Sequence, residues 1–100
     1  MSARELHLHL RVPPGGADAL RAFLARAIPF YEAPGDISVR LLQQVDDPDV
    51  FIEVVAYATV AAFDADQQRV EHDPEMQRWL AEWRTLLAGP PRVVVYAVEA

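Results

Sequence analysis

Residues 5–12 alternate strictly between polar and apolar side chains, and no other stretch limits the possible folds so strongly. Successive side chains of a β-strand point to opposite faces, so the alternation predicts a strand with one buried and one polar face. The apolar side chains are Leu6, Leu8, Leu10 and Val12, and the polar ones are Glu5, His7, His9 and Arg11. A one-sided strand needs a covering layer, which helices elsewhere in the chain would supply.

The stretch after this strand predicts one helix and then two further strands. Apolar residues recur at helical spacing over residues 17–28, and Pro29 is expected to end or kink that helix. Residues 37–45 and 50–58 are strand-like. The four residues between them, 46–49, are typical of a turn that joins a hairpin.

The rest of the chain predicts an interrupted helix and a last strand. Thr59 is a suitable cap for the first helical segment. Asp73 and Pro74 suit the cap and the first position of a second segment, so the helix should stop and restart there. Gly89 and the two prolines after it should end that segment, and residues 92–100 read as a strand.

The order of these elements is β-α-β-β-α-β, which is the ferredoxin-like pattern of α+β proteins. It predicts a four-stranded antiparallel sheet with the helices on one face, although other small α+β arrangements stay open. A length of 100 residues favours a single domain over residues 1–100.

Composition excludes several classes of partner and site. The chain has a net charge of −6, and its nine basic residues are all arginines without clustering, so no nucleic acid is expected to bind. No apolar run approaches the roughly 20 residues of a membrane span. There is no cysteine for disulfides or thiolate zinc sites, and no apolar stretch typical of a signal peptide. We therefore expect a cytoplasmic protein.

The expected hairpin turn fixes a register and, with it, the two faces of the sheet. Val45 would pair with Val50, Leu42 with Glu53 and Arg40 with Val55. The face away from the helices would then mix polar and apolar side chains: Glu5, His7, His9, Arg11, Ser38, Arg40, Leu42, Gln44, Phe51, Glu53, Val55 and Tyr57, with Val94, Tyr96 and Val98 from the last strand. An apolar patch of this extent favours a homodimer in which two sheets pack face to face.

A sequence of features over residues 30–83 resembles a known family. A Pro-Gly turn, a valine-rich hairpin, the strand "FIEVVAYAT" and a helix broken at "DPEMQRW" follow one another. In this order the chain resembles the dimeric α/β-barrel superfamily, most closely its NIPSNAP-like and antibiotic-biosynthesis-monooxygenase-like branches. The resemblance implies a homodimeric barrel. It also implies that a small aromatic or polyketide-like molecule binds in a cavity between the sheet and the helices.

The chain departs from the catalytic branches of that superfamily. Haem-degrading members use an asparagine together with a tryptophan and a histidine, and this sequence has no asparagine. Trp79 and Trp83 have the spacing of a buried helix stripe, so we expect them to pack in the core. Glu75 stands where some monooxygenase-like members carry a histidine.

The candidate site residues are those that the expected register places together on the mixed face. They are His7, His9, Arg40, Glu53, Tyr57 and Tyr96. His7 and His9 could bind a metal with Glu53 as a third ligand, but only two of the three are tied together by sequence, so we expect no metal. The histidines would instead line a ligand cavity or bond across the dimer interface. Glu53 is either a base with a raised pKa or the partner of Arg40 in an ion pair.

Two functions from different classes remain. The first is a small-molecule-binding protein of unassigned activity, for which a cofactor-independent monooxygenase or isomerase reaction is one alternative, and no cofactor is expected. The second is a structural or interaction module whose barrel is filled by side chains. The volume of the cavity distinguishes them.

Overall fold

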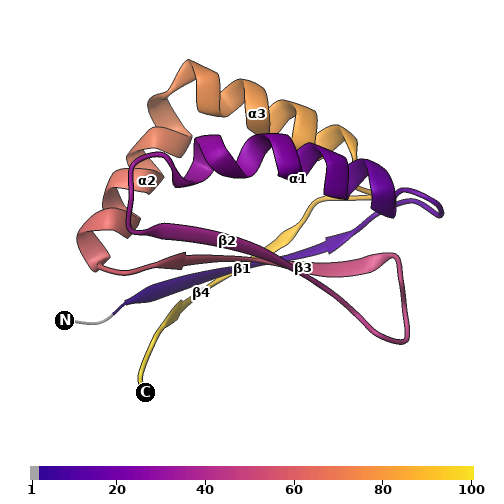
Figure 1. The fold of residues 1–100 in the computed structure, drawn as a ribbon, viewed down its shortest axis with the longest axis horizontal. Helices are drawn as coiled ribbons and strands as arrows, with labels where there is room; N and C mark the ends of the chain where they lie inside the picture. The colour runs from indigo at the N-terminus through magenta and orange to yellow at the C-terminus, as the bar shows by residue number, and fades with distance from the viewer. Residues whose placement is uncertain (1–2) are drawn as a thin grey trace.

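The computed structural model describes residues 3–100. Four strands form one antiparallel sheet in the order β2-β3-β1-β4, which confirms the expected ferredoxin-like fold. The strands are β1 (Arg4–Arg11), β2 (Ile37–Gln43), β3 (Val50–Tyr57) and β4 (Arg92–Ala97). The helices are α1 (Ala17–Glu32), α2 (Val60–His72) and α3 (Pro74–Thr85). All three lie on one face of the sheet, and the other face, here called the open face, carries no helix (Figure 1).

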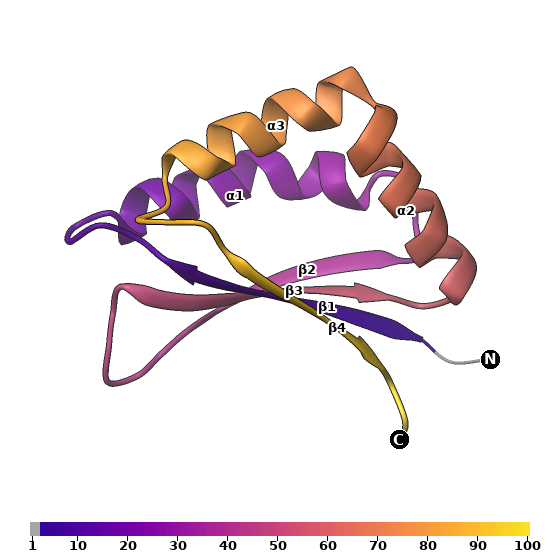
Figure 2. The same cartoon turned by 180° about the vertical axis from the view of Figure 1, so that it is seen from behind.

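Capping side chains set the boundaries of α2 and α3. The Thr59 hydroxyl accepts a 3.0 Å hydrogen bond from the Ala62 N–H at the start of α2. Asp73 Oδ1 accepts a 2.9 Å bond from the Glu75 N–H, and Pro74 takes the first position of α3. The expected interruption is therefore confirmed, and the chain changes direction between α2 and α3 (Figure 2).

Helix α1 continues past Pro29 to Glu32, so of the two effects expected of Pro29, an end or a kink, the end of the helix is wrong. A proline removes one backbone N–H, and here it does so close to the C-terminal end of the helix. The last turn is held from outside, because Arg69 donates hydrogen bonds to the carbonyls of Phe30 and Tyr31 at 3.1 and 2.7 Å. Tyr31 is also buried, so its packing favours the extra turn.

The core lies between α1, α3 and the two central strands. Its fully buried members include Leu20 and Phe23 from α1 and Phe51 from β3. Trp83 is 5% exposed within this core. Trp79 packs against the core, and its ring centroid lies 6.0 Å from that of Phe30. The predicted core position is confirmed for Trp83, whereas Trp79 is only partly buried and packs against the core.

The register of the β2–β3 hairpin differs by one residue from the prediction. Gln43 pairs with Phe51, and the Gln44 N–H donates to the Val50 carbonyl at 2.9 Å. The loop therefore spans residues 45–49, and Val45 lies in it fully exposed. The predicted pairing of Val45 with Val50 is wrong, and the same slip moves every β3 side chain to the opposite face.

Two features explain this register. Within the loop, the Val50 N–H donates to the Asp47 carbonyl and the Asp49 N–H to Asp47 Oδ1, so the extra residue is held by its own hydrogen bonds. On β3, the larger aromatic side chains of Phe51 and Tyr57 reach the core and are 1% and 2% exposed. Burying two aromatic rings removes more apolar surface from water than the opposite register would. The same register also buries Glu53.

Within residues 3–100, no helix has the length and apolar character needed to span a membrane.

Candidate functional site

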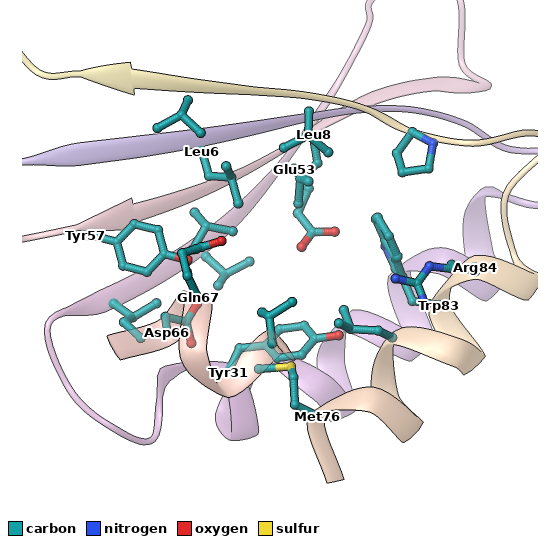
Figure 3. Close-up of a pocket in the computed structure, with 18 residues that line it drawn as sticks. Leu6, Leu8, Tyr31, Glu53, Tyr57, Asp66, Gln67, Met76, Trp83 and Arg84 are labelled. Atoms are coloured by element: carbon teal, nitrogen blue, oxygen red, sulfur yellow. The ribbon is translucent and has the colours of Figure 1, made fainter. Parts of the chain in front are cut away.

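A cavity of about 290 Å³ lies between the sheet and the helices. Most of the 18 side chains that line it are apolar (Figure 3). The sheet contributes Leu6, Leu8, Ile37, Val39, Val55, Val93 and Val95, and the helices contribute Val70, Met76 and Leu80. Val93 and Val95 belong to the edge strand β4 and are about half exposed, so the cavity reaches solvent on that side. Such a space suits a small and mainly apolar molecule.

Glu53 is the titratable group at the centre of this cavity. It projects from the middle of β3, and its carboxyl group points into the open space (Figure 3). The side chain is 3% exposed, and Oε1 has no hydrogen-bond partner within residues 3–100. Burial raises the pKa of Glu53 from 4.5 to about 7, because an apolar surrounding disfavours the charged form. Glu53 can therefore gain or lose a proton near neutral pH.

Two buried donors also line the cavity without a partner in the described part of the chain. They are the Trp83 indole N–H and one amide N–H group of Gln67. The indole is close enough to Glu53 to oppose slightly the rise in its pKa, although the two groups do not reach hydrogen-bond geometry. An unpaired buried donor costs free energy, so these groups favour a bound molecule that carries oxygen atoms.

Tyr57 and Asp66 close one end of the cavity. The Tyr57 hydroxyl donates a 2.6 Å hydrogen bond to Asp66 Oδ2, and Asp66 Oδ1 accepts a 3.1 Å bond from Arg69 Nε. Burial and then the Asp66 carboxylate raise the pKa of Tyr57, so the phenol keeps its proton. Its O–H group is committed to Asp66, which gives Tyr57 a structural role at the wall of the cavity.

The six residues predicted to share one face lie on both faces of the sheet. Glu53 and Tyr57 face the helices and line the cavity, whereas His7, His9, Arg40 and Tyr96 lie on the open face. The expectation that they share a face is wrong because of the one-residue slip in β3. For the same reason Glu53 cannot pair with Arg40, nor share a metal ion with the two histidines.

On the open face, His7 contacts two of its neighbours. Its Nε2 lies 2.7 Å from Glu5 Oε1, and its ring lies 4.7 Å from that of Tyr96. His9 Nε2 is buried and has no hydrogen-bond partner among the described residues. Local burial, and then the positive charge of Arg92 and the proximity of His7, lower the pKa of His9.

Sequence patterns alone assign no site role to the helical residues that complete the cavity. Asp66, Gln67 and Arg84 are polar residues on amphipathic helices, and nothing in their spacing separates them from a solvated face. Trp83 carried a usable signal, because a buried indole needs a partner for its N–H group. An indole within a stripe of core residues could therefore have been assigned to a site as well as to the core.

The comparisons with known proteins agree with this architecture. The model of the antibiotic biosynthesis monooxygenase family matches residues 5–82. Among curated proteins, none matches the chain.

Three solved structures illustrate the likeness of fold. A candidate antibiotic biosynthesis monooxygenase from Bordetella bronchiseptica is 21% identical, with 100% of both chains covered and a TM-score of 0.81. The Rv0793 protein of Mycobacterium tuberculosis is 24% identical, with 99% of this chain and 97% of that chain covered and a TM-score of 0.76. A protein of unknown function from Nitrosomonas europaea is 27% identical over 100% of this chain and 92% of that one, with a TM-score of 0.74. The expected resemblance is confirmed for this branch of the superfamily: the chain belongs to the antibiotic biosynthesis monooxygenase family.

Proposed function

We propose that the cavity binds a small aromatic or polyketide-like molecule and that Glu53 removes a proton from it. The observation that carries this proposal is the Glu53 carboxyl group. The side chain is 3% exposed and points into an apolar cavity, and Oε1 has no hydrogen-bond partner among the described residues. Burial raises the pKa of this carboxyl group to about 7. A base with a pKa near the working pH is both available and strong enough for proton transfer.

The groups around Glu53 favour an oxygen-bearing substrate. A phenol O–H, or a C–H beside a carbonyl, is acidic enough for a carboxylate in a dry cavity to remove its proton. Loss of the proton leaves negative charge on an oxygen of the substrate. The unpaired N–H of Trp83, close to Glu53, is a suitable donor to that oxygen and would stabilise the charge as it develops.

Two reactions can follow the removal of a C–H proton without a cofactor. Return of the proton to a different carbon isomerises the substrate. Reaction of the carbanion with dioxygen converts a CH2 group into a carbonyl and releases water, with one oxygen atom in each product. Membership of the monooxygenase family supports the second reaction.

We also propose that the protein is a homodimer joined through its open faces. Leu42 and Tyr96 on this face are 43% and 46% exposed, and Leu42 lies beside the apolar Ile52 of β3. His7, His9, Arg40 and Tyr96 lie on the sheet face opposite the cavity, and we assign them to this interface. Light scattering at micromolar concentration should give twice the mass of the chain. A monomer would contradict this assignment and leave the role of Glu53 standing.

Proton exchange tests the role of Glu53 directly. The bicyclic ketone 2-tetralone has acidic C–H groups beside its carbonyl, and NMR in D2O follows their exchange. The parent protein should accelerate this exchange, with a rate that rises with pH through about 7. Glu53→Gln should bind the ketone, as judged by a thermal shift, without accelerating exchange.

A surface variant away from both the cavity and the open face is the matched control. Arg78 is exposed on α3 and does not line the cavity, so Arg78→Gln should exchange the ketone at the parent rate. Oxygen uptake in the same reaction then separates a monooxygenase from an isomerase. A parent protein that neither binds the ketone nor accelerates its exchange would contradict the proposal and favour the non-catalytic module.

A further inference from the structure

Arg84 brings a positive charge to the rim of the cavity. It lies in the last turn of α3, next to Trp83, and is among the residues that line the cavity (Figure 3). Its side chain is exposed, so it borders the open space from the solvent side. No ion pair or side-chain hydrogen bond in residues 3–100 involves its guanidinium group.

The other charges along the cavity do not neutralise Arg84. Asp66 already accepts hydrogen bonds from Arg69 and Tyr57. On α3, Glu82 pairs with Arg26. Glu53 forms no ion pair with Arg84 within residues 3–100. The cation at the rim thus has no counter-charge within the described part of the chain.

A second feature beside Arg84 also points to a ligand. Trp83 is 5% exposed, lines the cavity, and has no partner for its indole N–H. Neighbouring residues of α3 therefore offer two kinds of unused donor, one buried and one at the rim. Both would suit a molecule that carries oxygen atoms along its length.

On the basis of the proposed function, we propose that the substrate is an aromatic acid whose carboxylate binds Arg84 at the rim. The ring system then occupies the apolar interior, and the acidic O–H or C–H group reaches Glu53. Arginine suits this role, because its planar guanidinium can hold a carboxylate through two parallel hydrogen bonds. The opposite orientation is disfavoured, since a carboxylate inside the cavity would meet the ionised form of Glu53 without solvent to screen the repulsion.

A purely structural reading of Arg84 makes a different prediction. A positive charge in the last turn of a helix interacts favourably with the helix dipole, whether or not a ligand binds. That role would give Arg84→Gln a small loss of stability and no change in ligand preference. Ligand discrimination therefore separates the two roles.

A matched pair of probes provides the test. 6-Hydroxy-2-naphthoic acid carries a carboxylate at one end and a phenol at the other, and 6-hydroxy-2-naphthamide is its neutral counterpart. Titration calorimetry at pH 7.5 should show that the parent binds the acid about tenfold more tightly than the amide, as expected for one charge-assisted contact. Arg84→Gln should lose this preference, and Arg84→Lys should keep part of it. Arg78→Gln, an exposed change on the same helix away from the cavity, should behave as the parent.

The outcomes separate this inference from the function on which it rests. Equal affinity of the parent for acid and amide, unchanged in Arg84→Gln, would overturn the carboxylate assignment while leaving the cavity as a binding site. Failure of the parent to bind either compound would count against both proposals. Loss of the preference in Arg78→Gln as well as in Arg84→Gln would mean a general charge effect and would overturn the assignment to Arg84.

Discussion

The hydroxyl of Tyr57 donates a 2.6 Å hydrogen bond to Asp66 Oδ2, which joins the end of β3 to the middle of α2. Asp66 is 8% exposed, and its second oxygen accepts a bond from Arg69. Arg69 in turn donates to the carbonyls of Phe30 and Tyr31 at the end of α1. One buried carboxylate thus connects a strand and two helices around the end of the cavity.

Removing Asp66 should therefore destabilise the fold more than removing the hydroxyl of Tyr57. Asp66→Ala leaves the hydroxyl and a partly buried arginine without their partner, and we expect a loss of about 3 kcal/mol in the free energy of unfolding. Tyr57→Phe leaves Asp66 paired with Arg69 and should cost about 1 kcal/mol. Urea denaturation measures both, with the exposed Asp64→Ala as control. Equal stabilities of Asp66→Ala and Asp64→Ala would contradict the network.

Glu53 should make the protein less stable as the pH rises from about 4.5 to 7. The folded state holds a proton on Glu53 up to a pKa of about 7, whereas the unfolded chain releases it near 4.5. The folded state binds more protons in this window, so the free energy of unfolding falls with rising pH, by roughly 3 kcal/mol in total.

Glu53→Gln should remove this contribution, because the amide has no proton to lose. The variant should match the parent near pH 4.5 and be the more stable of the two at pH 8, as measured by urea denaturation across the range. A parent that is as stable as the variant at pH 8 would mean that Glu53 is ionised in the folded state at little cost.

The cap of α3 should contribute a modest and measurable stability. Asp73→Ala leaves the Glu75 N–H without its 2.9 Å partner and should lower the free energy of unfolding by about 1 kcal/mol, a typical loss for an N-cap aspartate. Gln68→Ala, an exposed change in the preceding helix, is the control. No difference in thermal unfolding between the two variants would show that α3 does not depend on this cap.

Local signals in the sequence were sufficient for most of the fold. The alternation over residues 5–12, the helical spacing over 17–28 and the Asp73-Pro74 restart each depend on neighbouring residues alone, and all three are confirmed. The length of α1 beyond Pro29 was not predictable in this way. It depends on Arg69, which is distant in sequence and reaches the last carbonyls of the helix.

The candidate site was harder to predict, because it depended on a register. The sequence indicated Glu53 as a candidate base or ion-pair partner, and the structure places it in the cavity. The prediction that Glu53 shares a face with His7 and Arg40 was wrong, because the hairpin loop has five residues where a four-residue turn was expected. Since side chains alternate along a strand, a slip of one residue exchanges the two faces completely.

The register itself can be tested with two substitutions in the hairpin. Val45 is fully exposed in the loop, so Val45→Asp should change the free energy of unfolding by less than about 0.5 kcal/mol. Phe51 is 1% exposed in the core, so Phe51→Ala should cost about 4 kcal/mol. In the alternative register Val45 would pair with Val50 at the end of the sheet, and Phe51 would lie on the open face. Urea denaturation distinguishes the two arrangements, because a costly Val45→Asp together with a mild Phe51→Ala would require the alternative register and return Glu53 to the face of His7 and His9.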